Sequence, residues 1–260
     1  MVRLVVFALV LGLASSNQVE AGAPATGMRF EQVLDLTHTL AGAFPYIPVP
    51  GITFPFRLKP VATLEANGVA ANSWEIHEHL GTQIDAPNHF AKGGRSLDQL
   101  RVDELIVPVI VIDISERAQH DANTVLTIAD ITAWEVRHGR VPDGACMMMH
   151  SGWQRFVADP ARFLGRDAQG VLHFPGISLP AAQFLLRERA VWELGVDTIS
   201  IDPGWDHSYQ THRALLGADK WALEAMANLD ELPAVGATLF IGATKVRDAT
   251  GGLVRLIATW

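Results

Sequence analysis

The residues from 77 to 90, HEHLGTQIDAPNHF, combine three histidines with a glutamate, a glutamine and an aspartate. Four of these side chains fall within a short interval: an imidazole at His79, an amide at Gln83, a carboxylate at Asp85 and an imidazole at His89. Nitrogen and oxygen donors spaced closely around a glycine turn can converge on one divalent cation with little backbone freedom to lose. The same residues could instead form a hydrogen-bonded loop at the end of a strand. Their spacing alone does not distinguish a metal site from such a loop.

The residues before the glycine turn have the alternation expected of a strand over 72–82. In a strand, Glu75, His77 and His79 share one face and Trp74 lies on the other. The register around the turn favours His79 as the ligand. We therefore expect His77 to lie beside the metal site rather than to bind the ion.

Segments of β-branched and apolar residues elsewhere indicate the elements that must position these groups. The expected strands are 33–40, 109–114, 146–150, 196–202 and 238–246. Thr127 and Asp130 resemble a capping box that opens a helix ending near Gly139. Pro180 suits the first turn of a second helix that continues to Gly195. Strands interleaved with helices predict an α/β fold, with one mixed sheet and flanking helices.

Composition restricts the class of protein. The chain has 260 residues, of which 49% are hydrophobic, so a sizeable core is available. A formal net charge of −8 argues against nucleic acid as a partner, because phosphate binding needs clustered Lys and Arg. We find no internal repeat and no low-complexity linker, so residues 26–260 are expected to form one domain. Cys146 is the single cysteine and lies in an apolar run, which favours a role in packing.

The N-terminus resembles a secretory signal. Arg3 precedes an uncharged apolar run, 4–13, and Val19 and Ala21 fit a small-residue cleavage site. The run is too short to span a bilayer core of roughly 30 Å, which needs about 20 residues. We therefore expect a signal peptide over 1–21, export to the periplasm or medium, and no stable membrane insertion. A buried N-terminal strand or helix is the alternative.

A family resemblance adds to this interpretation of the residues. The segment 79–90 resembles the H-x-G-T-H-x-D-x-P-x-H motif of the metal-dependent cyclase family, which includes bacterial kynurenine formamidases and isatin hydrolases. Further segments resemble the family in the same order along nearly the whole mature chain. They are 35–38, 150–153, 174–176, 200–202, 212–216 and 224–232.

The resemblance implies roles for the matching positions. His79 and Asp85 match metal ligands, and Asp85 could bridge two ions. His89 matches the catalytic histidine. His212 and Glu224 match a distant pair that completes a second metal site.

Gln83 departs from the family pattern, which has a histidine ligand at this position. An amide oxygen is a harder donor than imidazole nitrogen, so it should weaken Zn²⁺ binding and shift the preference toward Mn²⁺. The substitution leaves open one ion or two, and it also leaves open a loss of activity.

The resemblance implies a metal-dependent hydrolase that cleaves an amide-type C–N bond in a small molecule, either a cyclic amide such as isatin or an aryl-formamide. His89 would act as general acid–base. An aromatic-binding pocket could be lined by Phe44, Tyr46 and Trp74, although core packing explains each of them equally well. Asp202 is a candidate to support the site.

Two alternatives remain at this point. The same site could serve a cyclase or dehydratase, or the chain could be an exported metal- or ligand-binding protein without turnover. The resemblance also implies a homo-oligomer.

Overall fold

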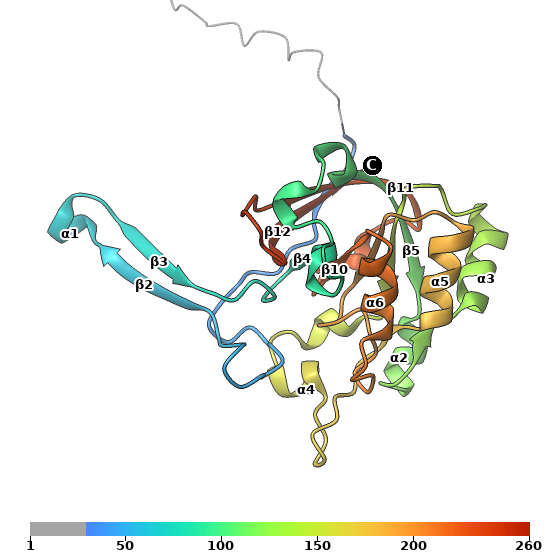
Figure 1. Ribbon diagram of the computed structural model, residues 1–260, viewed down its shortest axis with the longest axis horizontal. Helices are drawn as coiled ribbons and strands as arrows, with labels where there is room; N and C mark the ends of the chain where they lie inside the picture. Colours follow the sequence, from blue (N-terminus) through green and yellow to red (C-terminus); the bar gives the residue numbers. More distant parts are fainter. Residues whose placement is uncertain (1–29) are drawn as a thin grey trace, which may run out of the picture.

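The computed structural model describes residues 30–260, and Figure 1 shows their arrangement. The predicted signal peptide, 1–21, lies outside the described residues. Within the described part of the chain, no helix is long and apolar enough to cross a membrane.

One curled sheet of eight strands organises the molecule. In spatial order its strands are β1 (Val33–Asp35), β12 (Gly251–Thr259), β11 (Val235–Ala243), β5 (Ile106–Asp113), β7 (Cys146–His150), β9 (Glu193–Val196), β10 (Trp221–Glu224) and β4 (Gln83–Asp85). Because β4 also pairs with β12, the sheet closes on itself like a barrel, with β1 as an additional outer strand. The predicted α/β fold with a single mixed sheet is confirmed.

The middle of the sheet is parallel, from β5 through β7 and β9 to β10, and the remaining pairings are antiparallel. Parallel strands are covered on both faces, which explains why a run such as CMMMH is apolar throughout. Helices α3 (Ile128–His138), α5 (Leu179–Glu188) and α6 (Gln210–Gly217) lie together against one side of the sheet (Figure 1). One hydrophobic cluster lies between these helices and the sheet, and a second joins the strands that close the barrel.

Short elements complete the fold. They are α1 (Leu64–Asn67), α2 (Ser115–His120), α4 (Pro160–Leu164), the parallel pair β6 (Val125–Leu126) and β8 (Gly176–Ile177), and the antiparallel pair β2 (Arg57–Ala62) and β3 (Ala71–Glu75).

Both predicted helices exist, but the second is shorter than expected. Thr127 caps α3 through the predicted box with Asp130, and the helix ends before Gly139. α5 begins at Leu179, with Pro180 in its first turn, and ends at Glu188. Residues up to Gly195 therefore do not extend the helix, because the chain has already turned into the buried strand β9.

The strand predictions differ in accuracy. Strand 146–150 is confirmed, while 109–114 and 238–246 fall mostly within β5 and β11. The prediction of a strand over 196–202 is wrong beyond Val196. There the carboxylate of Asp197 accepts hydrogen bonds from the backbone of Ser151 and Trp153, so the chain forms a loop instead of continuing the ladder.

The first strand is also shorter than predicted, since β1 ends at Asp35 and Thr37 makes only a single bridge to Met226. Strands β4, β10 and β12 were not predicted. β4 and β10 have three and four residues, which is too few for a period-2 pattern to be recognised.

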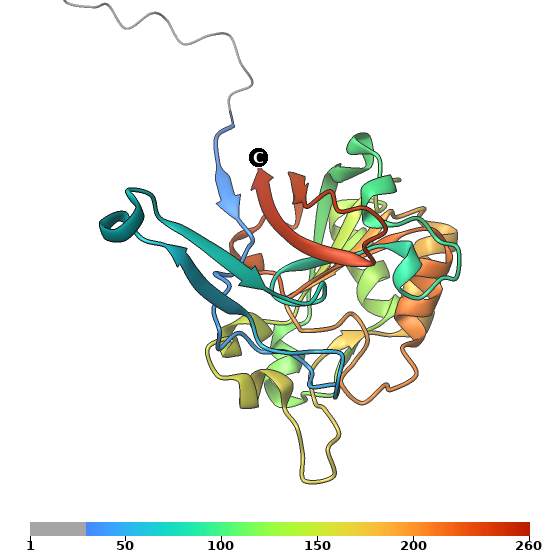
Figure 2. The same cartoon turned by 60° about the vertical axis from the view of Figure 1, so that its left-hand side comes forward.

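The hairpin of β2 and β3, with α1 at its tip, projects from the body of the molecule (Figures 1 and 2). The strand expected over 72–82 thus ends at Glu75, where the chain returns to the body. On one face of the hairpin Leu58 pairs with Trp74, and these residues are 53% and 66% exposed. On the other face Glu75 forms ion pairs with Arg57 and Lys59.

Glu193 is an acidic residue in the core. It lies on β9 between Cys146 of β7 and Trp221 of β10, and no part of it is exposed. Trp221 donates its indole N–H to the carboxyl group. Burial raises the pKa of Glu193 to about 8, although the hydrogen bonds from Trp221 and Cys146 oppose the change.

We expect Glu193→Gln to reduce the loss of stability as pH rises from about 5 to 8. From about pH 4.5 to 8 the unfolded chain has lost this proton while the folded chain keeps it, so stability falls as pH rises toward 8. The variant lacks this contribution, which amounts to roughly 1.4 kcal/mol per pH unit at most. Denaturant unfolding at pH 5, 6, 7 and 8 measures it, with Glu65→Gln on the exposed helix α1 as control. If the free energies of unfolding of wild type and variant differ by the same amount at every pH, the expectation is contradicted.

Candidate active site and metal centre

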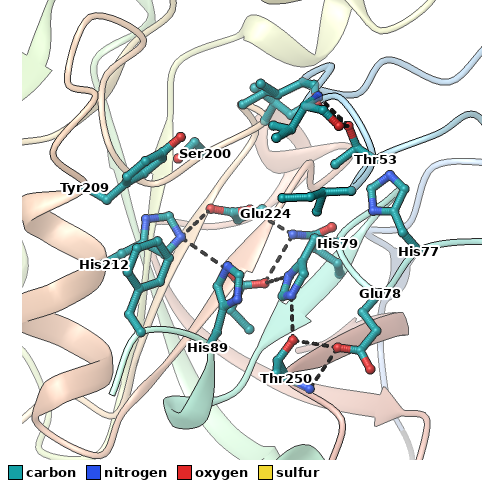
Figure 3. A pocket seen from close by; sticks show the side chains of 17 residues that line it. Thr53, His77, Glu78, His79, His89, Ser200, Tyr209, His212, Glu224 and Thr250 are labelled. Atoms are coloured by element: carbon teal, nitrogen blue, oxygen red, sulfur yellow. Dashed lines mark hydrogen bonds and ion pairs between the residues drawn. The ribbon is translucent and has the colours of Figure 1, made fainter. Parts of the chain in front are cut away.

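A cavity of about 500 Å³ lies where β4, β10 and α6 meet (Figure 3). All six residues predicted to bind metal or catalyse line it, namely His79, Gln83, Asp85, His89, His212 and Glu224. The fold therefore brings the segment 79–89 together with residues more than a hundred positions later. Their roles as ligands and catalyst remain predictions, and this geometry allows them.

Strand pairing places the acidic groups. Gln83 lies opposite Glu224 in the antiparallel pair of β4 and β10, and Asp85 lies opposite Gly251 at the start of β12. Since side chains two residues apart on a strand share a face, Gln83 and Asp85 both project into the cavity. His89 follows on a short 3₁₀ helix, Pro87–His89.

His212 of α6 forms one group of potential metal donors with Asp85 and Glu224. Its Nε2 lies 3.1 Å from Asp85 Oδ2 and 3.1 Å from Glu224 Oε1. Its Nδ1 lies 2.5 Å from Asp202, whose carboxylate also accepts from the backbone N–H groups of Thr211 and His212. A carboxylate behind a histidine fixes the orientation of the ring, which is the usual arrangement behind a metal ligand.

His79 and His89 form a second group with the same aspartate. His79 Nδ1 lies 2.8 Å from Asp85 Oδ1, and the His79 and His89 rings stack with centroids 3.8 Å apart. In each group the donor atoms lie within 4.8 Å of one another. Asp85 belongs to both groups, so it could bridge two cations.

Gln83 lies between the two carboxylates. Its Nε2 donates to Asp85 Oδ1 at 3.1 Å and to Glu224 Oε2 at 2.9 Å. The oxygens left free by the amide, Oδ2 of Asp85 and Oε1 of Glu224, are those that face His212. Gln83 thus holds the two acidic side chains together.

The electrostatics of the site follow from burial and charge. Burial would raise the pKa of Asp85, but the charge of His79 and hydrogen bonds from His212 and His79 hold it well below its usual range. Burial raises the pKa of Glu224, and the neighbouring charge of Asp85 adds to the effect. Burial opposes a charge on His212, yet hydrogen bonds to Asp202, Asp85 and Glu224 raise its pKa well above the ordinary value.

The two histidines of the second group differ. Burial would lower the pKa of His79, but the charge and hydrogen bond of Asp85 raise it overall. Burial lowers the pKa of His89 to about 4, with Asp85 opposing the change and His79 adding to it. His89 is therefore a neutral imidazole at physiological pH.

These residues fit a divalent cation. Ligand atoms around a cation bound at about 2.1 Å lie roughly 3 Å apart, close to the 3.1 Å separations around His212. Two buried carboxylates, Asp85 and Glu224, beside imidazole nitrogens supply the negative charge that a cation needs. The donor set contains no thiolate, which suits Mn²⁺ as well as Zn²⁺.

The three predicted aromatic residues do not line the cavity in this single chain. Phe44 is buried in a separate cluster with Trp153 and Phe163, and Tyr46 packs at the edge of that cluster with its ring against His77. Trp74 lies on the projecting hairpin. Their contribution to substrate binding remains a prediction.

The apolar wall comes from residues that were not singled out in the sequence. They are Ile47, Val49, Ile52, Phe90, Ile199 and Tyr209. Glu78 and Thr250 were also missed, although they adjoin predicted residues in space. Glu78 stands next to His79 in the sequence, and this was the one available signal.

Comparisons with known proteins agree with this fold. The Cyclase family model matches residues 34–203. An isatin hydrolase of Roseibium aggregatum is 32% identical over 242 residues, covering 87% of this chain and 91% of that protein. A kynurenine formamidase of Erythrobacter litoralis is 26% identical over 232 residues, covering 87% and 93%. The solved structure of isatin hydrolase A from Labrenzia aggregata bound to benzyl benzoate has a TM-score of 0.83 and 33% identity, covering 88% and 93%.

Proposed function

The chain belongs to the cyclase family of amide-cleaving hydrolases, and from this we propose that it opens a small cyclic amide such as isatin. The observation that carries the proposal is the cavity in which two groups of metal donors share Asp85. Greater identity to isatin hydrolase than to kynurenine formamidase favours the cyclic amide over the aryl-formamide.

We propose that the cation is held by His79, Asp85, His212 and Glu224, with Gln83 as a further donor through its amide oxygen. Carboxylate and amide oxygens among the donors favour Mn²⁺, and the shared Asp85 allows one ion or two. When bound, the cation polarises a carbonyl and makes water more acidic.

The protein residues then handle the proton and the ring. His89, as a neutral imidazole, accepts a proton from the attacking water and returns it to the departing nitrogen. Glu224 or Asp85, both of which line the cavity, orients that water. The C–O bond forms first, and the C–N bond breaks when the tetrahedral intermediate collapses with the proton from His89 on the nitrogen. The product carries a carboxylate and an amine on one molecule.

The apolar wall suits an aromatic or other flat ring. Ile47, Val49 and Ile52 come from one loop, and Phe90 and Ile199 add to the apolar lining. Burying a ring against these side chains would orient its amide toward the polar floor and exclude water from the remainder of the cavity.

We expect His89→Ala to lower kcat by about 10²–10⁴-fold while the metal content per chain is unchanged. Elemental analysis and assays on isatin and on N-formylkynurenine measure this, with His120→Ala, an exposed residue at the end of α2, as control. Full activity would refute the proposed role. Loss of metal would instead make His89 a ligand, since it lies within reach of His79 and Asp85.

The same assays separate the other candidates. A higher kcat/KM on N-formylkynurenine than on isatin would favour an aryl-formamidase. If no substrate turns over with added Mn²⁺, and Gln83→His restores activity, the natural chain is a binding protein whose catalysis Gln83 has removed. Ring closure in place of hydrolysis would identify a cyclase or dehydratase.

We also propose a homo-oligomer, which the projecting hairpin supports. A two-stranded hairpin is marginally stable alone, and exposed apolar patches commonly mark contacts with another molecule. The apolar face with Leu58 and Trp74 has no cover within the described chain.

We expect wild type to elute as an oligomer, and the double variant Leu58→Ser/Trp74→Ser to dissociate. Light scattering after gel filtration gives the masses. Lys59→Ser, on the charged face of the same hairpin, is the matched control. A monomeric wild type would disprove the proposal.

The N-terminal sequence supports a proposal of export to the periplasm or medium, because a basic start and a short apolar run precede small residues. Fractionation of producing cells tests it, with the mass of the mature chain showing whether cleavage follows Ala21. An intact chain in the cytoplasm would contradict it.

A further inference from the structure

We propose that Glu78 and Thr250 act as a pair of positioning residues that decide which nitrogen His79 offers to the metal. This inference rests on the proposed function, because it takes His79 as a metal ligand. Glu78 and Thr250 do not belong to either group of donors. Thr250 contacts Nε2 of His79, whereas Asp85 contacts Nδ1, and Glu78 binds Thr250 (Figure 3).

The hydrogen bonds fix the direction of each donor. Glu78 Oε2 lies 2.9 Å from the Thr250 backbone nitrogen and 2.5 Å from Thr250 Oγ1. A carboxylate only accepts, so the single hydroxyl proton of Thr250 is donated to Glu78. Thr250 Oγ1 also lies 2.9 Å from His79 Nε2, and toward this atom it can only accept. Nε2 of His79 must therefore carry a proton.

The consequence falls on the other nitrogen. With Nε2 protonated, Nδ1 is the atom of His79 that can present a lone pair, and it faces Asp85 Oδ1 at 2.8 Å. A lone pair and a carboxylate oxygen at this distance repel each other unless a proton or a cation is shared between them. The Glu78–Thr250 pair thus directs the lone pair of His79 to the place where a cation would also meet Asp85.

The fold holds Thr250 firmly in this position. Its carbonyl accepts from the backbone N–H of Ala86 at 2.9 Å, and the next residue, Gly251, lies opposite Asp85 in the pairing of β12 with β4. A Cβ on Gly251 would lie 2.6 Å from Cε1 of His79, so the absence of a side chain makes room for the ring. Thr250 and Gly251 together shape the edge against which His79 rests.

Glu78 lines the cavity beside Thr250. Its side chain is exposed, and its hydrogen bonds within residues 30–260 all go to Thr250. Because the carboxylate accepts from both the N–H and the O–H of Thr250, it fixes the direction in which the hydroxyl donates its proton. Glutamine at this position would keep the shape but could donate to Oγ1, which would free the hydroxyl proton to turn toward His79.

The experiment measures the tautomer and the metal affinity separately. The protein is labelled with ¹⁵N-histidine and loaded with Zn²⁺. Long-range ¹H–¹⁵N spectra should then show His79 protonated at Nε2. The His79 signals are assigned as those that disappear in His79→Ala. Glu78→Gln and Thr250→Val should lose this signature and weaken Zn²⁺ and Mn²⁺ binding in competitive titrations by about 10–100-fold. Thr250→Ser should restore both, because it returns the hydroxyl.

Controls separate the possible failures. Thr132→Val, on the exposed face of α3, should change neither readout. If His79→Ala binds metal as tightly as wild type, the ligand assignment in the proposed function fails. If His79→Ala loses metal while Glu78→Gln and Thr250→Val keep wild-type affinity and the Nε2–H signature, the positioning role alone is overturned. Because Glu78→Gln is isosteric and at the surface, it remains informative even if Thr250→Val fails to fold.

Discussion

The repulsion between two buried carboxylates is the constraint on which the site depends. Asp85 and Glu224 are both almost completely buried and come from neighbouring strands. Like charges in a medium of low dielectric are costly unless donors or cations lie between them. The amide of Gln83 and the ring of His212 supply such donors on opposite sides of the pair. The arrangement around the pair is thus one that would also accept a divalent cation.

Each donor is in turn held by a contact outside the site. Asp202 anchors His212, and Thr250 anchors His79. These supporting groups come from the loop after β9 and from the residue just before β12. Together with β4 and β10, four separate regions of the chain therefore contribute to one small volume. Positions of this kind transmit changes in the surrounding loops directly to the donor atoms.

A dense local motif and a family resemblance pointed to His79, Asp85, His212 and Glu224, and the fold does bring these residues to one cavity, while their roles as ligands stay predictions. The capping box at Thr127 and the apolar strand 146–150 were likewise recognisable from local rules. The features that could not be predicted depend on contacts between residues distant in the sequence. The loop after Val196 follows from Asp197 binding another loop, and no local pattern near 250 indicates that Thr250 meets Glu78.

The pairing of β4 with both β10 and β12 has a consequence for how the chain folds. β4 has only three residues, yet it closes the barrel and carries both Gln83 and Asp85. Its partners lie about 140 and 170 residues later, so this closure must overcome a large loop entropy and gains few hydrogen bonds in return. Barrel closure and assembly of the site are therefore one event. A ligand that binds Asp85 and Glu224 together would also stabilise the pairing of β4 with β10. Local opening of β4 would in turn release the ligand.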